Sequence, residues 1–265
     1  MRERSKEYSR LKLRLRLISA GMGLVFLAFL TFTGLSLRLR AAIPGGPLLQ
    51  VAGYFILLLL IWEGISFPLS LYGGYRVEHR YGLSRENLWS WVWDYLKSIF
   101  LSLALGLPLV EGLYWLLREG GGNWWLYAAG GAIVVGVLMT KLSPVLLAPL
   151  FYKFTPLGDE QLERELLSLA SLAGVKARGV FRMGLGQTSR KAAAGLAGLG
   201  RTRRIILSDT LLEGFDREEI GAVLAHELGH HAGRHIGKTI LIQSAFLLGI
   251  FYLLHRVLSL SLAPL

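Results

Sequence analysis

The chain has 265 residues, of which 53% are hydrophobic and only 18% are charged, with a mean hydropathy of +0.47. A soluble domain usually carries about 25% charged residues, so the composition excludes a disordered chain, a coiled coil and an ordinary water-soluble enzyme. The net charge is +11, and the absence of cysteine excludes disulfide frameworks, cysteine nucleophiles and cysteine-ligated zinc. Apolar runs of about 20 residues indicate an integral membrane protein.

The N-terminus is a basic tail, residues 1–16, with seven basic and two acidic residues. It leads directly into an apolar run, so we expect it to face an anionic membrane surface in the cytoplasm. We expect no nucleic-acid partner, because no basic patch interleaved with aromatic residues accompanies the charge.

Residues 17–150 are expected to form a four-span membrane domain with a cytoplasmic loop at 73–97. The predicted spans are residues 17–37, 48–72, 98–117 and 124–147. The tail and the second loop are richer in Lys and Arg than the first and third loops. This bias predicts a cytoplasmic N-terminus, and four spans return the chain to the same side.

Two acidic residues, Glu63 and Glu111, fall within the predicted spans. Acidic residues inside a membrane are costly and often functional. The alternative is that each lies near the interface or faces a polar partner, and the sequence leaves both interpretations open.

Residues 151–238 indicate a small α/β domain. The pattern predicts a helix at 159–173 and strands at 175–183, 192–197 and 204–207. Asp216 precedes Glu219 by three positions, which predicts a capping box and a helix from residue 217 to about 231. Residues 239–265 contain a fifth apolar span. The expected fold class is therefore a mostly α, multi-span membrane protein with a small α/β domain.

The predicted helix carries an HExxH motif made of His226, Glu227 and His230. Residues i and i+4 share one face of a helix, so both imidazoles can reach one metal ion. Glu227 can take a proton from a water activated by that metal and pass it to a leaving amine. The pattern predicts a Zn2+ site with His226 and His230 as ligands and Glu227 as the catalytic base. The alternative is a surface helix with two incidental histidines.

His231 points about 100° away from His230 on a helix, which favours a surface or supporting role. His235 comes one residue too early for the third histidine of the HExxHxxGxxH pattern. On a continuous helix it would lie about 180° from His226.

These features resemble the integral-membrane zinc peptidases of the CAAX prenyl protease type, which have the bacterial HtpX-like proteases as relatives. The similarity covers nearly the whole chain. Beyond the zinc motif it is carried by three stretches, residues 75–93, 144–157 and 203–230. The second stretch favours the CAAX-protease branch.

The resemblance implies a gluzincin site, in which two histidines and a glutamate from a later helix bind zinc. It also implies an edge strand that pairs with extended substrate, here Ala192, Ala193, Ala194, Gly195 and Leu196. Ala193 and Ala194 stand where the family often has Asn-Ala. A further family histidine matches His235, which implies a supporting role behind the ligands.

One departure concerns the third ligand, because no Asp or Glu follows Glu227. We expect either that a C-terminal portion beyond residue 265 completes the site, that a partner supplies the ligand, or that zinc is not held.

The leading hypothesis is a membrane-embedded zinc metalloendopeptidase, in a bacterial inner membrane or an endomembrane, with its peptidase domain in the cytoplasm. The resemblance implies a peptide or protein substrate, either a prenylated CAAX protein or an unprenylated membrane protein. The alternative is a catalytically incomplete membrane scaffold or regulator with the same fold. A transporter that uses the intramembrane acids is a weaker hypothesis, because no internal repeat is apparent.

Overall fold

The computed structural model describes residues 2–261, except for residue 187 and residues 199–202 and 233–234. The chain forms two compact units, Met1–Arg118 and Glu119–Leu265. Among the described residues, five helices are long and apolar enough to cross a membrane: Glu3–Phe32, Pro47–Arg80, Leu88–Glu119, Gly121–Thr140 and Gly237–Ser261. Few of their residues are buried, so their apolar surfaces suit contact with lipid.

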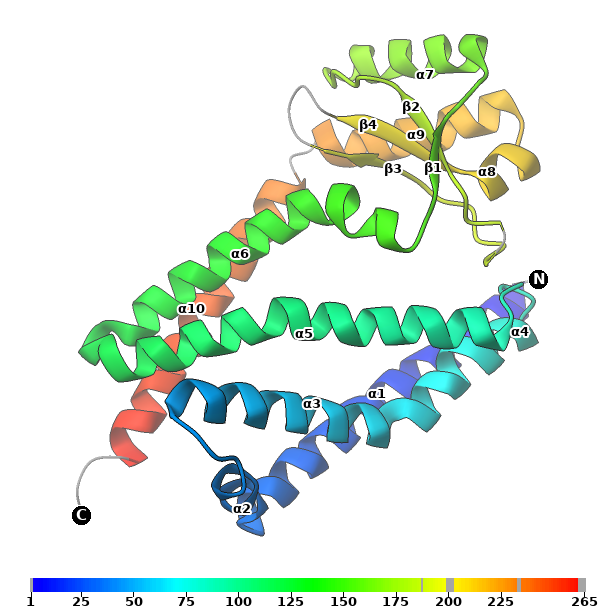
Figure 1. Cartoon of the computed structure of the whole chain (residues 1–265). Coiled ribbons are helices and arrows are strands. Elements are labelled where there is room, and N and C mark those ends of the chain that lie inside the picture. The colour runs from blue at the N-terminus through cyan, green and yellow to red at the C-terminus, as the bar shows by residue number, and fades with distance from the viewer. Residues whose placement is uncertain (1, 187, 199–202, 233–234, 262–265) are drawn as a thin grey trace. The chain divides into compact units, whose positions relative to one another are not determined.

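The first unit is helical throughout (Figure 1). Its elements are α1 (Arg2–Phe32), α2 (Leu35–Ala41), α3 (Pro47–Ser70), the π-helical turn η1 (Leu71–Arg76), α4 (Val77–Arg80) and α5 (Leu88–Glu119). The basic N-terminal residues are thus part of the same helix as the first span. That helix ends at Phe32 rather than near residue 37, because Gly34 adopts a left-handed conformation with φ 66°.

The second and third helical stretches of the first unit extend further than the spans predicted from hydropathy. The second helical stretch continues through η1 and α4 to Arg80, and only residues 81–87 connect it to α5. The helix α5 begins at Leu88, because the Asn87 side chain accepts a hydrogen bond from the Ser90 backbone N–H at 2.7 Å. The polar residues that flank the apolar runs therefore lie within the helices.

Two long helices of the second unit, α6 (Trp124–Leu146) and α10 (His235–Ser261), pack against each other. Aromatic rings join them at one end, where Trp125 and Tyr252 lie 5.3 Å apart and Trp124 and Phe251 lie 6.4 Å apart. Both helices are candidate membrane spans, which agrees with the predicted fourth and fifth spans. The turn η3 (Ala148–Leu150) follows α6.

The rest of the second unit is a four-stranded sheet with three helices (Figure 1). The elements are β1 (Phe154–Pro156), α7 (Glu160–Leu172), β2 (Val180–Met183), β3 (Ala194–Ala197), β4 (Arg204–Ser208), α8 (Asp209–Gly214) and α9 (Arg217–Ala232). The strand order is β1-β2-β4-β3, with β2 and β4 parallel and the outer pairs antiparallel. The sequence pattern predicts all of these strands except β1.

One hydrophobic core joins α7 and α9 to the sheet. Ile205 and Leu207 alternate along β4 and so point to the same face, and both are 0% exposed. They cluster with Leu162 and Leu166 of α7 and with Leu224 of α9. The core therefore fixes α9, which carries the HExxH motif, against β4 and α7.

Candidate active site

A capping box starts the helix that carries the HExxH motif, as the sequence predicts. The Asp216 carboxylate accepts a hydrogen bond from the Glu219 N–H at 2.8 Å, and Glu219 accepts one from the Asp216 N–H at 3.1 Å. The two bonds satisfy backbone donors that a helix N-terminus leaves unpaired. The helix runs without interruption from Arg217 to Ala232, so positions 226 and 230 are one turn apart.

The buried face of α9 determines where the motif points. Ile220, Leu224 and Leu228 lie at i, i+4 and i+8 and are at most 2% exposed. Position 226 is about 200° around the helix from Leu224, and His226 is exposed. Glu227 is half-buried. The histidine positions therefore lie on the side of α9 away from the core.

The motif fits a metal ion by the chemistry of its donors. Two imidazoles at i and i+4 on a rigid helix lie about 5–6 Å apart at their Cβ atoms, which suits shared coordination. The side chains of His230, His231 and His235 lie outside the described part of the structure, although the backbone places residue 230 in α9 and residue 235 at the start of α10. Within the described residues, no group of three His, Asp or Glu side chains could hold a metal.

An edge strand lies beside this helix. β3 is the last strand of the sheet and pairs with β4 alone among the described residues, with Ala194 opposite Leu207 and Leu196 opposite Ile205. α9 contacts β3 directly. The structure thus brings the predicted strand 192–196 next to the HExxH helix, although Ala192 and Ala193 precede β3 itself.

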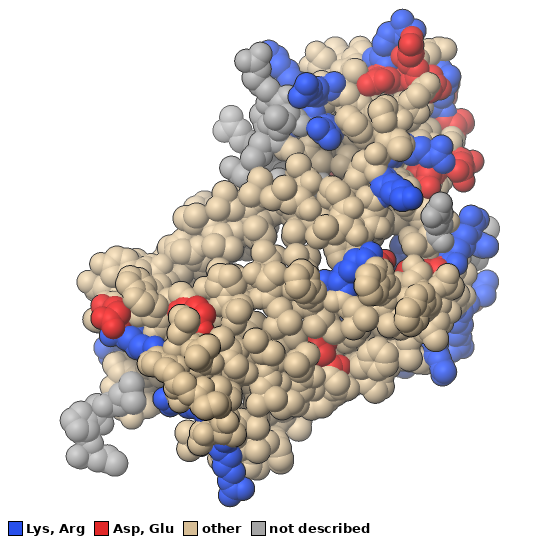
Figure 2. Space-filling model, viewed as in Figure 1, with Lys and Arg blue, Asp and Glu red and all other residues tan. Residues whose placement is uncertain are grey.

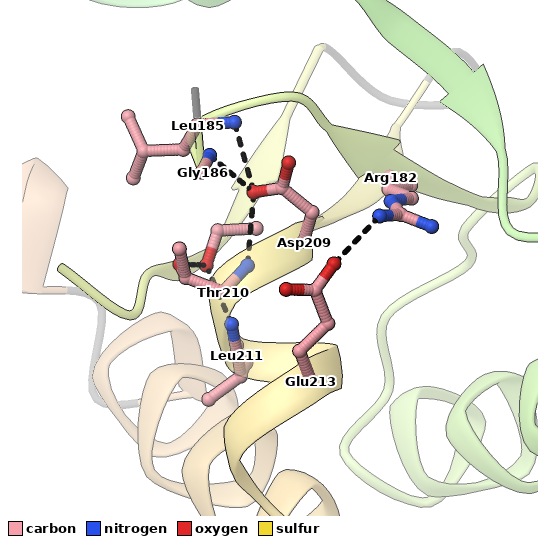
Figure 3. A network of polar contacts seen from close by, with 8 residues as sticks. Arg182, Leu185, Gly186, Asp209, Thr210, Leu211 and Glu213 are labelled. Carbon is pink, nitrogen blue, oxygen red and sulfur yellow. Dashed lines mark hydrogen bonds and ion pairs between the residues drawn. The ribbon is translucent and has the colours of Figure 1, made fainter. Parts of the chain in front are cut away.

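Asp209, at the junction of β4 and α8, accepts hydrogen bonds from the loop before β3 (Figure 3). Asp209 Oδ1 accepts hydrogen bonds from the N–H groups of Leu185, Gly186 and Thr210, at 2.9, 2.7 and 2.9 Å. An added Cβ at Gly186 would lie 3.2 Å from Asp209 Oδ2, so glycine permits this close approach. Asp209 therefore holds the start of the loop.

Ser208 holds the other end of the same loop. Its Oγ accepts a hydrogen bond from the Ala193 N–H at 2.8 Å, and its N–H donates to the Ala193 carbonyl at 2.8 Å. The Thr210 hydroxyl donates to the Lys191 carbonyl at 2.7 Å. Ser208 is fully buried and Asp209 is 8% exposed. These bonds fix the backbone that enters the edge strand.

Ser208 and Asp209 are not among the site residues predicted from the sequence. Their signal was present, because a Ser-Asp pair between a strand and a short helix is typical of an N-cap. The Ser208 hydroxyl does accept the Leu211 N–H at 3.2 Å as an N-cap. The bonds to residues 185, 186 and 193 depend on tertiary structure, which no local pattern reveals.

The intramembrane acids belong to the first unit. Glu63 of α3 accepts a hydrogen bond from the Tyr95 hydroxyl of α5, so it has the polar partner that one interpretation expected. One carboxylate oxygen of Glu111 is buried and has no hydrogen-bond partner among the described residues.

Comparison with known proteins identifies the family. Residues 2–153 match the family described as CAAX prenyl protease N-terminal, five membrane helices, and residues 156–263 match peptidase family M48. The chain belongs to the M48 peptidase family. Together with the five apolar helices, this confirms the predicted integral membrane protein and the resemblance to CAAX prenyl proteases.

Several relatives of this M48 chain are similar over most of its length. It is 30% identical over 236 residues to the uncharacterized metalloprotease YhfN of Bacillus subtilis, covering 88% of this chain and 55% of that protein. It is 34% identical to the CAAX prenyl protease 1 homolog of Arabidopsis thaliana, covering 68% and 43%. The chain spans about half the length of the curated relatives it matches.

The fold also matches a solved structure. The crystal structure of S. mikatae Ste24p superposes with a TM-score of 0.84 at 28% identity, covering 95% of this chain and 61% of that one. This match confirms the predicted fold class, a mostly helical membrane protein with a small α/β domain.

Proposed function

We propose that this M48 chain acts as a membrane-embedded, zinc-dependent metalloendopeptidase. The observation that carries the proposal is the HExxH motif on a capped helix that is anchored in the core and contacts an edge strand. The family implies a catalytic metal, and zinc peptidases with this motif use its two imidazoles as ligands and the neighbouring glutamate as the general base.

Each residue of the motif has a distinct role in the proposal. His226 and His230 hold the metal, and the buried Leu224 and Leu228 keep their helix in place. When bound, zinc lowers the pKa of a coordinated water to about 7 and polarises the scissile carbonyl. Glu227 accepts the proton of the attacking water and delivers it to the leaving amine nitrogen. His235, at the start of α10, has the supporting role that the family resemblance implies.

The edge strand supplies the substrate-binding backbone. An extended peptide adds to the outer edge of β3 by main-chain hydrogen bonds, with residues 192–196 as the contact. Four of these five residues are Ala or Gly, so the backbone can be approached closely there. The hydrogen bonds of Asp209 and Ser208 order this backbone, so a bound peptide is positioned with its scissile bond near Glu227.

The names of the relatives support a class of substrate, and the basic N-terminal residues support a location for the peptidase domain. Several relatives are named CAAX prenyl protease 1, which supports a prenylated protein tail as substrate. The basic N-terminal residues support a cytoplasmic N-terminus, and the spans then support a peptidase domain on the same side.

Metal content tests the ligand assignment. If these two histidines hold the metal, His226→Ala and His230→Ala should each reduce the zinc content of the purified chain strongly. His255→Ala is the control, because His255 lies in α10 beside Trp124 and Trp125 and should leave zinc content unchanged. Equal zinc in all four proteins would contradict the site and favour the scaffold alternative.

A further inference from the structure

A basic cavity lies in the first unit, apart from the HExxH motif. Its volume is about 740 Å³, and the first turns of α1 and the end of α4 contribute to its wall. Five basic side chains line it, namely Arg4, Lys6, Arg10, Arg14 and Arg80. Figure 2 shows Lys and Arg gathered at this end of the unit, while the surface between its two ends is largely uncharged.

A polar clamp, formed by Tyr8, Lys12 and Glu78, joins α1 to α4. The Tyr8 hydroxyl donates to Glu78 Oε1 at 2.7 Å, and Lys12 Nζ lies 2.8 Å from the same oxygen. Lys12 also donates to the Gly73 carbonyl at 3.1 Å, within the π-helical turn η1. The clamp is partly sheltered, because Glu78 is 8% exposed. The cavity wall is therefore a fixed structure.

The clamp also keeps the buried acid away from the cavity. Glu78 is engaged by Lys12 and Tyr8 and does not line the cavity. The acids that line it are Glu3 and Glu7, against five basic residues. Within the described residues, none of those five forms an ion pair within 4.0 Å.

Tyrosines add hydroxyl groups to the wall. Tyr72 and Tyr81 both line the cavity, and Tyr8 packs edge-on against Tyr81 at 5.2 Å. Partial desolvation and the neighbouring Glu7 raise the pKa of the Tyr81 hydroxyl further above neutrality, so Tyr81 adds no negative charge to the wall. Arginine guanidinium groups and neutral hydroxyls are suited to phosphate oxygens.

Apolar surface begins where the basic wall ends. Leu13, Leu17 and Ile18 of α1 are 56%, 64% and 50% exposed, next to Arg14 along the helix. A ligand with a phosphate and adjoining acyl chains matches both surfaces. We propose that the cavity binds the headgroup of an anionic phospholipid, with its acyl chains along α1.

Lipid competition tests the proposal on the full chain. The protein is reconstituted in phosphatidylcholine with a minor share of phosphatidylglycerol, and retained lipid is measured by native mass spectrometry. The wild type should retain phosphatidylglycerol preferentially. Arg10→Gln with Arg14→Gln should reduce this preference about tenfold, because both guanidinium groups line the cavity and would contact the phosphate directly.

A matched control removes the same charge elsewhere. Arg16→Gln with Arg85→Gln changes two exposed arginines that do not line the cavity, and it should alter the preference by less than about twofold. Equal losses in both double variants would overturn the proposal in favour of general surface charge. Displacement of the lipid by equimolar inorganic phosphate would overturn it in favour of a free anion.

Discussion

At the scale of single residues, a buried carboxylate at the start of α8 controls the backbone before the edge strand. Asp209 Oδ1 accepts three backbone N–H groups, two of them from the loop at residues 185 and 186. Hydrogen bonds to a charged acceptor are stronger than neutral ones, and each loses its partner if the carboxylate is removed. If residues 192–196 bind substrate as proposed, Asp209 acts on substrate binding through the loop.

Replacing Asp209 with alanine should destabilise the second unit by about 2–4 kcal/mol, because three N–H groups would lose their acceptor. Denaturant unfolding of the purified protein measures this loss of stability. In assays with a peptide substrate, KM should rise by a larger factor than kcat falls. Glu213→Ala is the control. Glu213 pairs with Arg182 at 3.0 Å, but both side chains are exposed (Figure 3), so its loss should cost at most about 1 kcal/mol. Similar unfolding curves for the two variants would contradict the role of Asp209.

At the scale of elements, one carboxylate joins the starts of α7 and α9. Asp159 caps α7 by accepting the N–H groups of Gln161 and Leu162 at 3.1 and 3.0 Å. Its second oxygen accepts a hydrogen bond from Arg217, the first residue of α9, at 2.9 Å. The hydrogen bond from Leu162 and the charge of Arg217 both lower the pKa of Asp159.

This lowered pKa predicts the direction of a pH effect. The folded state favours the carboxylate, so the stabilisation is present above the ordinary pKa of Asp, about 4, and is lost as the pH falls through the lower folded value. Asp159→Asn should be less stable than the wild type at pH 7, and its stability should fall less on acidification. Unfolding midpoints between about pH 3 and 7 measure this. Glu160→Gln, at an exposed neighbouring position, should keep the wild-type pH profile.

The sequence predicts α9 well because its determinants are local. Asp216 and Glu219 are three residues apart, and Ile220, Leu224 and Leu228 repeat at helical spacing. The histidines of the motif then follow by helix geometry alone. The sequence also predicts β3 and β4, whose ends differ from the predicted ones by at most two residues.

Other elements depend on contacts between distant residues. The π-helical turn at Leu71–Arg76 has its Gly73 carbonyl held by Lys12, which is far away in the sequence. β1 has only three residues, and it is defined by pairing with β2. Hydropathy locates apolar runs, but helix ends follow hydrogen bonds, as Gly34 and Asn87 illustrate.

At the scale of the whole molecule, the charge distribution predicts a membrane topology. The natural chain contains no cysteine, so each introduced thiol can be labelled without background. Ser5→Cys and Lys176→Cys should react with an impermeant maleimide from the cytoplasmic side only. Ala42→Cys, in the connection between α2 and α3, should react from the opposite side only. Labelling of positions 5 and 176 from different sides would contradict four spans between the tail and the sheet domain.

The proposed function requires a catalytic zinc site on α9 with Glu227 as the base. The most direct measurement is zinc content together with peptide cleavage by the wild type and by Glu227→Gln, with Glu218→Gln as an exposed control on the same helix. Zinc content should be equal in all three proteins, and cleavage should fall at least about 100-fold in Glu227→Gln alone. Cleavage by Glu227→Gln at the wild-type rate would contradict the proposed function.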